Sequence, residues 1–322
     1  MSRYYLGIDV GSVSTNLALI DENEKLLEKV YLRTMGNPIQ AIQKGFSQMH
    51  EAMPLHVSIC GIGATGSGRE LAAVIFGADV VKNEITAHGI AAMSQVENVQ
   101  TVFEIGGQDS KIILIRGGII TDFAMNTVCA AGTGSFLDRQ AARLGIPIEE
   151  FGSFAFKSLH PVRIAGRCAV FAESDMIHKQ QMGCSAEDII FGLCEALVRN
   201  YLGNVGKSKG IREKVVFQGG VAANAGIVKA FEDALKIKIH VPLHYDVMGA
   251  IGAALLAKEA STHFTVSAFK GFEFLRRECR TKGINCNDCS NACEIVQISM
   301  DNEPDIYWGD RCGKWRSRRQ PA

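Results

Sequence analysis

The chain has 322 residues, of which 47% are hydrophobic and 21% are charged, and its formal net charge is +0. These values are typical of an ordinary globular protein that is long enough for two domains. The absence of a net charge argues against a general affinity for nucleic acid or an anionic membrane. No apolar run reaches the length of a membrane span and no secretory signal precedes the first strand, so we expect a cytoplasmic protein.

The first part of the chain alternates short apolar strands with helical patterns. Glycine, serine and threonine gather in the turns between them, as they do where strands end. We expect strands at 4–9, 17–21, 25–34 and 56–62, glycine-rich turns at 11–16 and 61–68, and helices at 38–53, 69–76 and 84–95.

The opening pattern then returns. The stretch Glu104-Ile105-Gly106-Gly107-Gln108-Asp109-Ser110 resembles Gly7-Ile8-Asp9-Val10-Gly11-Ser12, since in both an apolar strand breaks into a turn of Gly, Asp and Ser before a second strand. This predicts an internal duplication of a βββαβα unit; a chance similarity of two hairpins is the alternative. The second copy has expected strands at 101–105, 112–116, 119–125, 214–218 and 237–241, and expected helices at 135–144, 170–181, 186–205, 225–235 and 246–261.

The fold class predicted from this order is α/β, with two duplicated domains and a small cysteine-rich appendix. We expect the first domain at 1–97, completed by the helix at 246–261, the second at 98–245 and the appendix at 262–322.

Three strand ends carry glycine-rich turns that suit a nucleotide. Glycines let backbone N–H groups approach phosphate oxygens without a Cβ atom in the way, and the hydroxyls of Ser12, Ser14 and Thr15 add donors. Asp9 and Asp109 lie where carboxylates would hold a hydrated Mg²⁺, and the Walker pattern GxxxxGK[S/T] is absent. The turns are Asp9-Val10-Gly11-Ser12, Ile105-Gly106-Gly107-Gln108-Asp109 and Gln218-Gly219-Gly220-Val221.

Two cysteines lie in loops of small residues before helical patterns. Cys129 belongs to the stretch Asn126-Thr127-Val128-Cys129-Ala130-Ala131-Gly132-Thr133-Gly134, which joins a strand to a helix with Thr133 or Ser135 as the expected N-cap. Cys168 follows Ala165-Gly166-Arg167 in the same way. The positive end of a helix favours a thiolate, so the two cysteines suggest a ligand pair; the alternative is that each is a small buried hydrophobe.

Half of the ten cysteines lie at or beyond Cys279. Cys286, Cys289 and Cys293 form a CxxCxxxC pattern, and a hairpin of 294–300 with 305–308 would return Cys312 to it. This clustering predicts a second site for Zn²⁺ or an iron–sulfur cluster. Unpaired thiols in a loosely ordered tail are the alternative.

The phosphate turns and the Gly-Gly loop resemble those of the acetate and sugar kinase/Hsp70/actin superfamily. Together with the Cys129 stretch and Gly166-Arg167-Cys168-Ala169-Val170-Phe171, they resemble the ATP-dependent activators (reductive activases, component A) of 2-hydroxyacyl-CoA dehydratases and their benzoyl-CoA reductase relatives. The likeness covers Tyr4 to about Ala260, and the appendix departs from the short activators.

The resemblance implies two actin-like ATPase (ribonuclease H-like) domains and a homodimer. One four-iron, four-sulfur cluster would be shared, with Cys129 and Cys168 from each protomer, and Mg-ATP turnover would change the angle between two helices at the cluster. A dehydratase or a double-cluster reductase component would receive one low-potential electron, and ferredoxin or flavodoxin would supply it. The residues implied at the nucleotide are Asp9, Gln108 and Asp109 as catalytic groups, with Gly11, Ser12, Val13, Ser14, Thr15, Asn16, Gly106, Gly107, Gly132, Gly219, Gly220 and Val221 as binding groups.

Two other functions remain open at this point. A small-molecule kinase of the same superfamily would need a catalytic carboxylate beside a substrate pocket, and it gives no reason for Cys129 and Cys168. A non-catalytic nucleotide sensor would need neither cysteine.

Overall fold

The chain forms two compact units. The computed structural model describes residues 3–53, 57–166, 168–264, 266–272, 275, 279–300 and 304–315. The first unit consists of Met1–Gly11, Thr15–Asn83 and Ala253–Ala322, and the second of Ser12–Ser14 and Glu84–Gly252.

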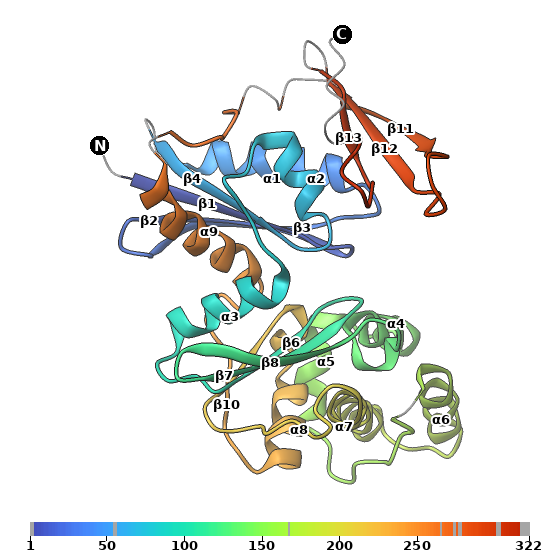
Figure 1. The fold of residues 1–322 in the computed structure, drawn as a ribbon. Coiled ribbons are helices and arrows are strands. Elements are labelled where there is room, and N and C mark those ends of the chain that lie inside the picture. Colours follow the sequence, from blue (N-terminus) through green and yellow to red (C-terminus); the bar gives the residue numbers. More distant parts are fainter. Residues whose placement is uncertain are drawn as a thin grey trace. The chain divides into compact units, whose positions relative to one another are not determined.

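The first unit contains a five-stranded sheet in the order β3-β2-β1-β4-β5 (Figure 1). β1 pairs antiparallel with β2 and parallel with β4. The parallel pair requires a crossover, which α1 provides before β4. The elements are β1 (Arg3–Val10), β2 (Ser14–Asp21), β3 (Leu26–Arg33), α1 (Pro38–Ala52), β4 (Ser58–Thr65), α2 (Arg69–Phe76), β5 (Val80–Val81) and α9 (Met248–Ala260).

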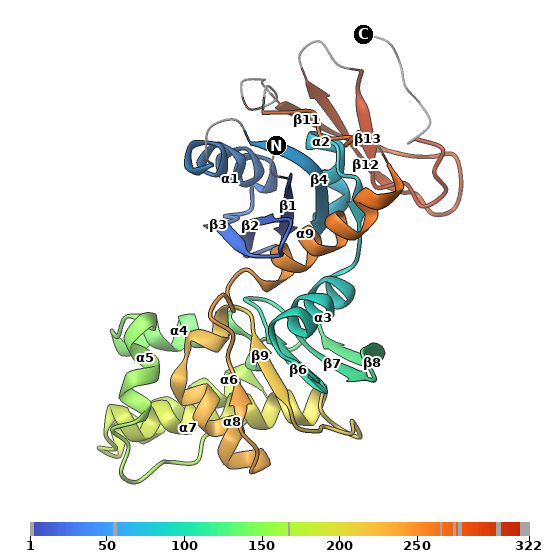
Figure 2. The ribbon, with the colours of Figure 1, turned by 90° about the vertical axis from the view of Figure 1, so that its left-hand side faces the viewer.

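The faces of this sheet are covered by different helices. Leu6 and Ile8 of β1 pack with Phe46 of α1 and Ile75 of α2 in one core. α9 lies along the sheet in the view of Figure 2, and it approaches β4 closely, because a Cβ atom at Gly63 would overlap the carbonyl oxygen of Ala253. The glycines of β4 therefore belong to the strand, so the prediction that the strand ends at residue 62 was wrong.

The second unit repeats this topology with the sheet order β10-β9-β6-β7-β8. β6 pairs antiparallel with β7 and parallel with β9, as β1 does with β2 and β4. The predicted α/β fold with a duplicated unit is confirmed. The strands are β6 (Thr101–Ile105), β7 (Ser110–Arg116), β8 (Ile119–Asn126), β9 (Val215–Gln218) and β10 (Ile239–His240).

Successive side chains of β6 and β7 point to opposite faces of the sheet, and each face has its own core. Phe103 and Ile112 pack against the helices α4 to α8, whereas Val102 and Ile113 pack against α3. The helix α5, which follows Pro147, was not predicted; at eight residues it is too short for a clear helical period. The helices are α3 (Glu84–Gln95), α4 (Gly134–Leu144), α5 (Ile148–Ala155), α6 (Ala169–Gln181), α7 (Ala186–Asn204) and α8 (Ala225–Leu235), with short 3₁₀ turns η1 (Ala130–Gly132) and η2 (Gly220–Ala223).

The C-terminal part of the first unit forms a separate antiparallel sheet in the order β11-β12-β13. The hairpin of β12 (Glu294–Met300) and β13 (Ile306–Trp308) agrees with the predicted one, and β11 (Cys279–Asn285) is a strand that was not predicted. Ile298 joins the core of the first unit, while Ile295 packs with Cys286 and Tyr307 in a small cluster of its own. A 3₁₀ turn, η3 (Ser261–His263), precedes this region.

Among the described residues, none of the helices has the length and apolarity needed to cross a membrane.

Candidate functional site

The first predicted phosphate turn follows β1 and is held by hydrogen bonds within the first unit. Thr34 donates its hydroxyl to Gly11 O at 2.8 Å and lies 3.0 Å from Thr15 Oγ1. Gly66 has φ +90°, and a Cβ atom there would lie 2.5 Å from Asp9 Oδ1. Only glycine fits beside this carboxylate, which is partly buried at the end of β1.

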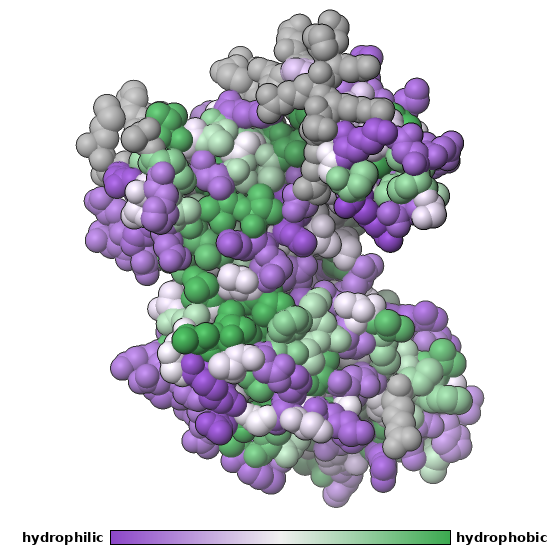
Figure 3. All heavy atoms as spheres, viewed as in Figure 1, coloured by the Kyte–Doolittle hydropathy of each residue, from purple (hydrophilic) through white to green (hydrophobic). Residues whose placement is uncertain are grey.

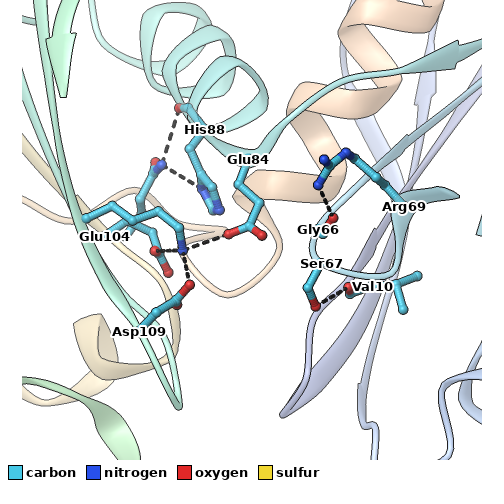
Figure 4. A network of polar contacts seen from close by, with 10 residues as sticks. Val10, Gly66, Ser67, Arg69, Glu84, His88, Glu104 and Asp109 are labelled. Carbon is cyan, nitrogen blue, oxygen red and sulfur yellow. Dashed lines mark hydrogen bonds and ion pairs between the residues drawn. The ribbon is translucent and has the colours of Figure 1, made fainter. Parts of the chain in front are cut away.

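The carbonyl oxygen of Val10 is also held in place. It accepts hydrogen bonds from Gly68 N at 2.8 Å and Ser67 Oγ at 3.3 Å. Arg69 donates to Gly66 O at 3.0 Å, which closes the turn after β4 (Figure 4).

The tip of the first turn, Ser12–Ser14, belongs to the second unit. There the side chain of Val13 lies against the second phosphate turn, since a Cβ atom at Gly107 would be 2.7 Å from Val13 Cγ1. Ser12 is exposed and Ser14 is partly buried, whereas Asn16 is buried on β2. The structure thus brings Val13 and Gly107, two of the predicted binding residues, together.

The second phosphate turn is bonded to the start of α4. Gly134 N donates to Gly106 O at 2.8 Å, and Ser135 N donates to Gly107 O at 2.9 Å. The turn that would meet phosphate is therefore joined directly to the helix that follows the Cys129 loop. Gln108 is exposed at the tip of this turn.

A buried lysine gathers three carboxylates beneath the same turn (Figure 4). Lys111 Nζ lies 2.7 Å from Glu84 Oε2, 2.8 Å from Glu104 Oε2 and 2.9 Å from Asp109 Oδ2. Only 2% of the Lys111 side chain is exposed. The ion pair with Lys111 therefore orients the carboxylate of Asp109, the predicted Mg²⁺ ligand.

Burial and charge shift the pKa values of this cluster. Burial raises the pKa of Glu104 to about 7, and Lys111 only partly opposes the effect. Burial lowers the pKa of Lys111, but the neighbouring carboxylates outweigh burial and raise it. Burial, and then the charge of Lys111, lower the pKa of His88 to about 3, so this ring is neutral at physiological pH. Its Nδ1 lies 2.9 Å from Gln218 Nε2.

The lysine cluster was not anticipated from the sequence, although a signal for it exists. Glu104 and Lys111 are the charged residues in the apolar runs on either side of the Gly106–Ser110 turn, and in the hairpin they are directly paired. Opposite charges at paired positions of two buried strands predict an ion pair.

The third predicted loop, Gly219-Gly220-Val221, lies beside the second one. Gly219 has φ +90°, and a Cβ atom there would lie 2.6 Å from Ile105 O and 2.7 Å from Glu104 Oε1. Val221 in turn lies against Gly134 at the start of α4. Within the second unit, the second and third loops and the start of α4 are therefore in contact.

Cys129 lies in a loop shaped by Asn126. Asn126 Oδ1 accepts a hydrogen bond from Cys129 N at 3.0 Å, and its Nδ2 donates to Cys129 O at 2.8 Å. Cys129 lies in the loop before α4, as expected, and a 3₁₀ turn, η1, separates it from the helix. Thr133 is the N-cap of α4, but its hydroxyl donates back to Ala130 O at 2.8 Å instead of capping the helix.

Cys168 is the N-cap residue of the thirteen-residue helix α6. Both it and Cys129 are partly buried cysteines that form no disulfide among the described residues. Arg167, which belongs to the predicted Cys168 stretch, lies outside the described residues.

Asn200 of α7 bridges the two cysteine loops, and the sequence analysis missed it. Its Nδ2 donates to Cys129 Sγ at 3.5 Å and to Gly166 O at 2.8 Å, and the residue is only 4% exposed. A Cβ atom at Gly132 would lie 2.7 Å from Asn200 Oδ1, so Gly132, one of the predicted nucleotide-binding residues, makes room for this amide. A polar residue on the buried face of an apolar helix was the available signal.

A cavity of about 360 Å³ opens between α4 and α6, beside both cysteine loops. Ala130 and Ala169, which follow the two cysteines, line it together with Gln140. Gln140 is 1% exposed, and neither polar atom of its side chain has a hydrogen-bond partner among the described residues. Arg139 and Glu173, which form an ion pair at 3.2 Å, also line the cavity.

Large apolar side chains next to the two cysteines are exposed to solvent. Val128 is 94% exposed, Val170 69% and Phe171 67%. Figure 3 shows further apolar surface on the second unit near β8, which carries the exposed residues Ile119 and Phe123. Exposed apolar groups that gather in this way mark contact surfaces.

The appendix cysteines are divided between the two ends of its sheet. Cys286, Cys289 and Cys293 lie in the loop between β11 and β12, and Cys312 lies in the turn after β13, whereas Cys279 pairs with Met300 at the opposite end. Within the described ranges, no three His, Cys, Asp or Glu side chains are grouped so as to hold a metal ion.

The fold of the chain is that of the actin-like ATPases. Solved structures with this fold include a xylulose kinase from Brucella ovis, at 13% identity and a TM-score of 0.51, and the ethanolamine utilization protein EutJ from Carboxydothermus hydrogenoformans, at 16% identity and a TM-score of 0.50. They cover 81% and 78% of this chain and share its fold alone.

Residues 6–257 match the model of the BadF/BadG/BcrA/BcrD ATPase family, and the chain belongs to this family. It is 35% identical over 263 residues to the (R)-2-hydroxyglutaryl-CoA dehydratase activating ATPase of Acidaminococcus fermentans, covering 80% of this chain and 98% of that protein. The crystal structure of that dehydratase's component A superposes with a TM-score of 0.73, at 34% identity over 80% of this chain and 99% of that one. The activator of the 2-hydroxyisocaproyl-CoA dehydratase from Clostridium difficile, with bound ADPNP, gives a TM-score of 0.72 at 30% identity, over 81% and 96%.

These relatives confirm the predicted family. The family match ends at residue 257, so the C-terminal appendix lies outside it.

Proposed function

We propose that this protein is an ATP-hydrolysing electron donor that activates a 2-hydroxyacyl-CoA dehydratase or a related reductase component. The observation that carries the proposal is the bridge from Asn200 to both cysteine loops. A buried amide that donates to a sulfur suits a thiolate ligand, and a kinase or a passive nucleotide sensor has no use for it.

The nucleotide would bind through the three glycine loops, with Mg²⁺ held by Asp9 and Asp109. These residues fit the ion, because Asp9 is a partly buried carboxylate at a strand end and Asp109 is oriented by Lys111. Bound Mg²⁺ would neutralise charge on the phosphates. Gln108, exposed at the tip of the second turn, would orient water.

Cys129 and Cys168 would hold an iron–sulfur cluster together with the same cysteines of a second copy. Each chain contributes two partly buried cysteines on loops that Asn200 joins, and a cubane cluster needs four. Such a cluster supplies a carrier for one electron at low potential.

The contact between the phosphate turn and α4 gives nucleotide a route to the cysteines. Gly106 and Gly107 accept hydrogen bonds from the first residues of α4, and the loop before α4 carries Cys129. A shift of the turn between nucleotide states would move this helix start. For nucleotide to shift the cysteine loops, it must bind more tightly to one position of the turn than to the other.

The exposed apolar residues beside the cysteines support a two-fold dimer. Val128, Val170 and Phe171 lie next to the proposed ligands, and an isologous contact would cover the same side chains of both copies. The named activities of the relatives suggest an acyl-CoA dehydratase as the acceptor, and ferredoxin or flavodoxin is the proposed electron source. We propose that the protein acts in the cytoplasm.

The proposal is tested by measuring iron per chain and molecular mass on protein purified without oxygen. We expect four irons per dimer in the wild type, and loss of iron with a shift toward monomer in Cys129→Ser and Cys168→Ser, since cluster and dimer are linked by mass action. Cys60→Ser is the matched control, because Cys60 lies on β4 of the first unit. A monomer carrying four irons bound to the core would refute the shared site.

A further inference from the structure

We propose that Cys286, Cys289, Cys293 and Cys312 form a tetrathiolate Zn²⁺ site at one end of the C-terminal sheet, separate from the ATPase core. This site goes beyond the electron-donor function. It lies after residue 257, where the family match ends.

The strand register selects these four cysteines. Asn285 pairs with Glu294, which brings Cys286 and Cys293 to the same end of the sheet. Val296 pairs with Trp308, so the chain after β13 runs toward that end as well. Cys279 pairs with Met300 at the other end, about 20 Å away for a strand of this length. The register therefore excludes Cys279.

Contacts between the two loops hold them next to each other. Cys286 N donates to Cys293 O at 2.8 Å, which closes the CxxCxxxC loop. Asp288, beside Cys289, forms an ion pair at 2.5 Å with Lys314, two residues after Cys312.

The turn that carries Cys312 also packs against the strand that follows Cys293. A Cβ atom at Gly309, which has φ +109°, would lie 2.5 Å from Glu294 O. The ring centroids of Tyr307 and Trp315 lie 5.2 Å apart, and both rings belong to the small cluster around Cys286. Both loops thus lie at the same corner of the sheet, where backbone, charge and aromatic contacts keep them near each other.

The chemistry of the four residues favours zinc. The spacings C-x2-C and C-x3-C fall within the range of structural zinc ligands, and short Cys loops on small antiparallel sheets are typical of zinc ribbons. The C-x2-C-x2-C-x3-C run of bacterial iron–sulfur proteins is absent. Cys289 and Cys312 are exposed, so closing the site requires these two loops to move inward, with release of thiol protons.

The end of the small sheet that carries the four cysteines has few buried residues to hold it together. Its own cluster of buried residues is limited to Cys286, Ile295 and Tyr307. Ile298 joins the sheet to the core of the first unit, but so small a cluster gives the cysteine end little support of its own, and small domains usually depend on metals or disulfides. All four cysteines are free thiols.

The test uses the full-length protein and measures zinc and iron separately after dialysis. We expect one zinc per chain, which a strong chelator removes and added Zn²⁺ restores, and tetrahedral thiolate bands when Co²⁺ replaces it. Cys286→Ser, Cys289→Ser, Cys293→Ser and Cys312→Ser should each weaken zinc binding at least tenfold. Cys279→Ser is the matched control and should retain zinc.

Three results would overturn the site: no stoichiometric zinc in the wild type, iron in its place, or equal loss of zinc in Cys279→Ser. The chelation and rebinding experiment on the wild type keeps the test valid where a variant fails to fold. The Cys129→Ser variant separates the two proposals. It should lose iron and keep zinc, and failure to find iron in the core would leave the zinc result standing.

Discussion

The side-chain amide nitrogen of Asn200 lies 3.5 Å from Cys129 Sγ, although 71 residues separate the two along the chain. The same nitrogen donates to Gly166 O at 2.8 Å, and Asn200 Oδ1 accepts from Asn204 Nδ2 at 2.9 Å. One buried amide therefore fixes both cysteine loops, and its removal leaves a buried carbonyl without its donor.

We expect Asn200→Ala to destabilise the second unit by about 1–3 kcal/mol, the usual cost of leaving buried polar groups unpaired. Iron retention should fall in parallel. Asn204→Ala is the control, because Asn204 is exposed and its side chain bonds to Asn200 Oδ1 without contacting either cysteine loop among the described residues. Denaturant unfolding and iron content measure the two effects. Equal effects of the two variants would show that Asn200 has no special role at the cysteines.

The sequence predicted the architecture well, because the duplicated strand order follows from local signals: apolar strands, glycine turns and helical periods. A polar residue on the apolar face of α7 was a signal for a buried amide at Asn200, but the sequence did not give its partners, because the packing of α7 brings Cys129 and Gly166 near it. It also missed β11, which carries a glycine and several polar residues and is stabilised by pairing with β12. Contacts between distant segments decide such features.

The Lys111 cluster provides a second prediction. Lys111→Met removes the ammonium shared by Glu84, Glu104 and Asp109, and leaves one buried and two partly buried acidic groups without their cation. We expect a loss of about 3–5 kcal/mol in unfolding free energy and weaker Mg-ATP turnover, since Asp109 loses its support.

Glu104→Gln should cost less than Lys111→Met, because the lysine keeps two carboxylate partners. Chemical denaturation of both variants measures the difference. The cluster would be unimportant for stability if Lys111→Met unfolded at the same denaturant concentration as the wild type.

The raised pKa of Glu104 predicts a pH dependence. Its folded pKa of about 7 lies above the ordinary value of 4.5, so the folded state holds this proton more tightly than the unfolded state does. The stabilising contribution of the protonated group is fully present below about pH 4.5 and is lost as the pH rises to about 7. Stability measured at pH 5 and pH 7.5 should therefore fall more in the wild type than in Glu104→Gln. Parallel pH profiles would contradict the assignment.

At Gln140 we predict a substitution that stabilises the protein. Its amide is buried, and the described residues offer its polar atoms no partner. Gln140→Leu should raise the unfolding free energy by about 1 kcal/mol, because it removes the cost of an unpaired buried amide. Gln180→Leu, at an exposed position of α6, should give no gain. A destabilised Gln140→Leu protein would show that ordered water or a ligand satisfies this amide.

Asp9 separates nucleotide chemistry from cluster binding. Its carboxylate lies at the end of β1, so close to Gly66 that no side chain fits there, and it is the proposed ligand of Mg²⁺ beside the first phosphate turn. Asp9→Asn keeps the shape and removes the negative charge, so Mg-ATP turnover should fall by about tenfold or more. The iron content should not change, because Cys129 and Cys168 belong to the other unit. Asp233→Asn, on the surface of α8, is the matched control and should hydrolyse ATP as the wild type does. ATPase rates of Asp9→Asn equal to those of this control would rule out Asp9 as the metal ligand.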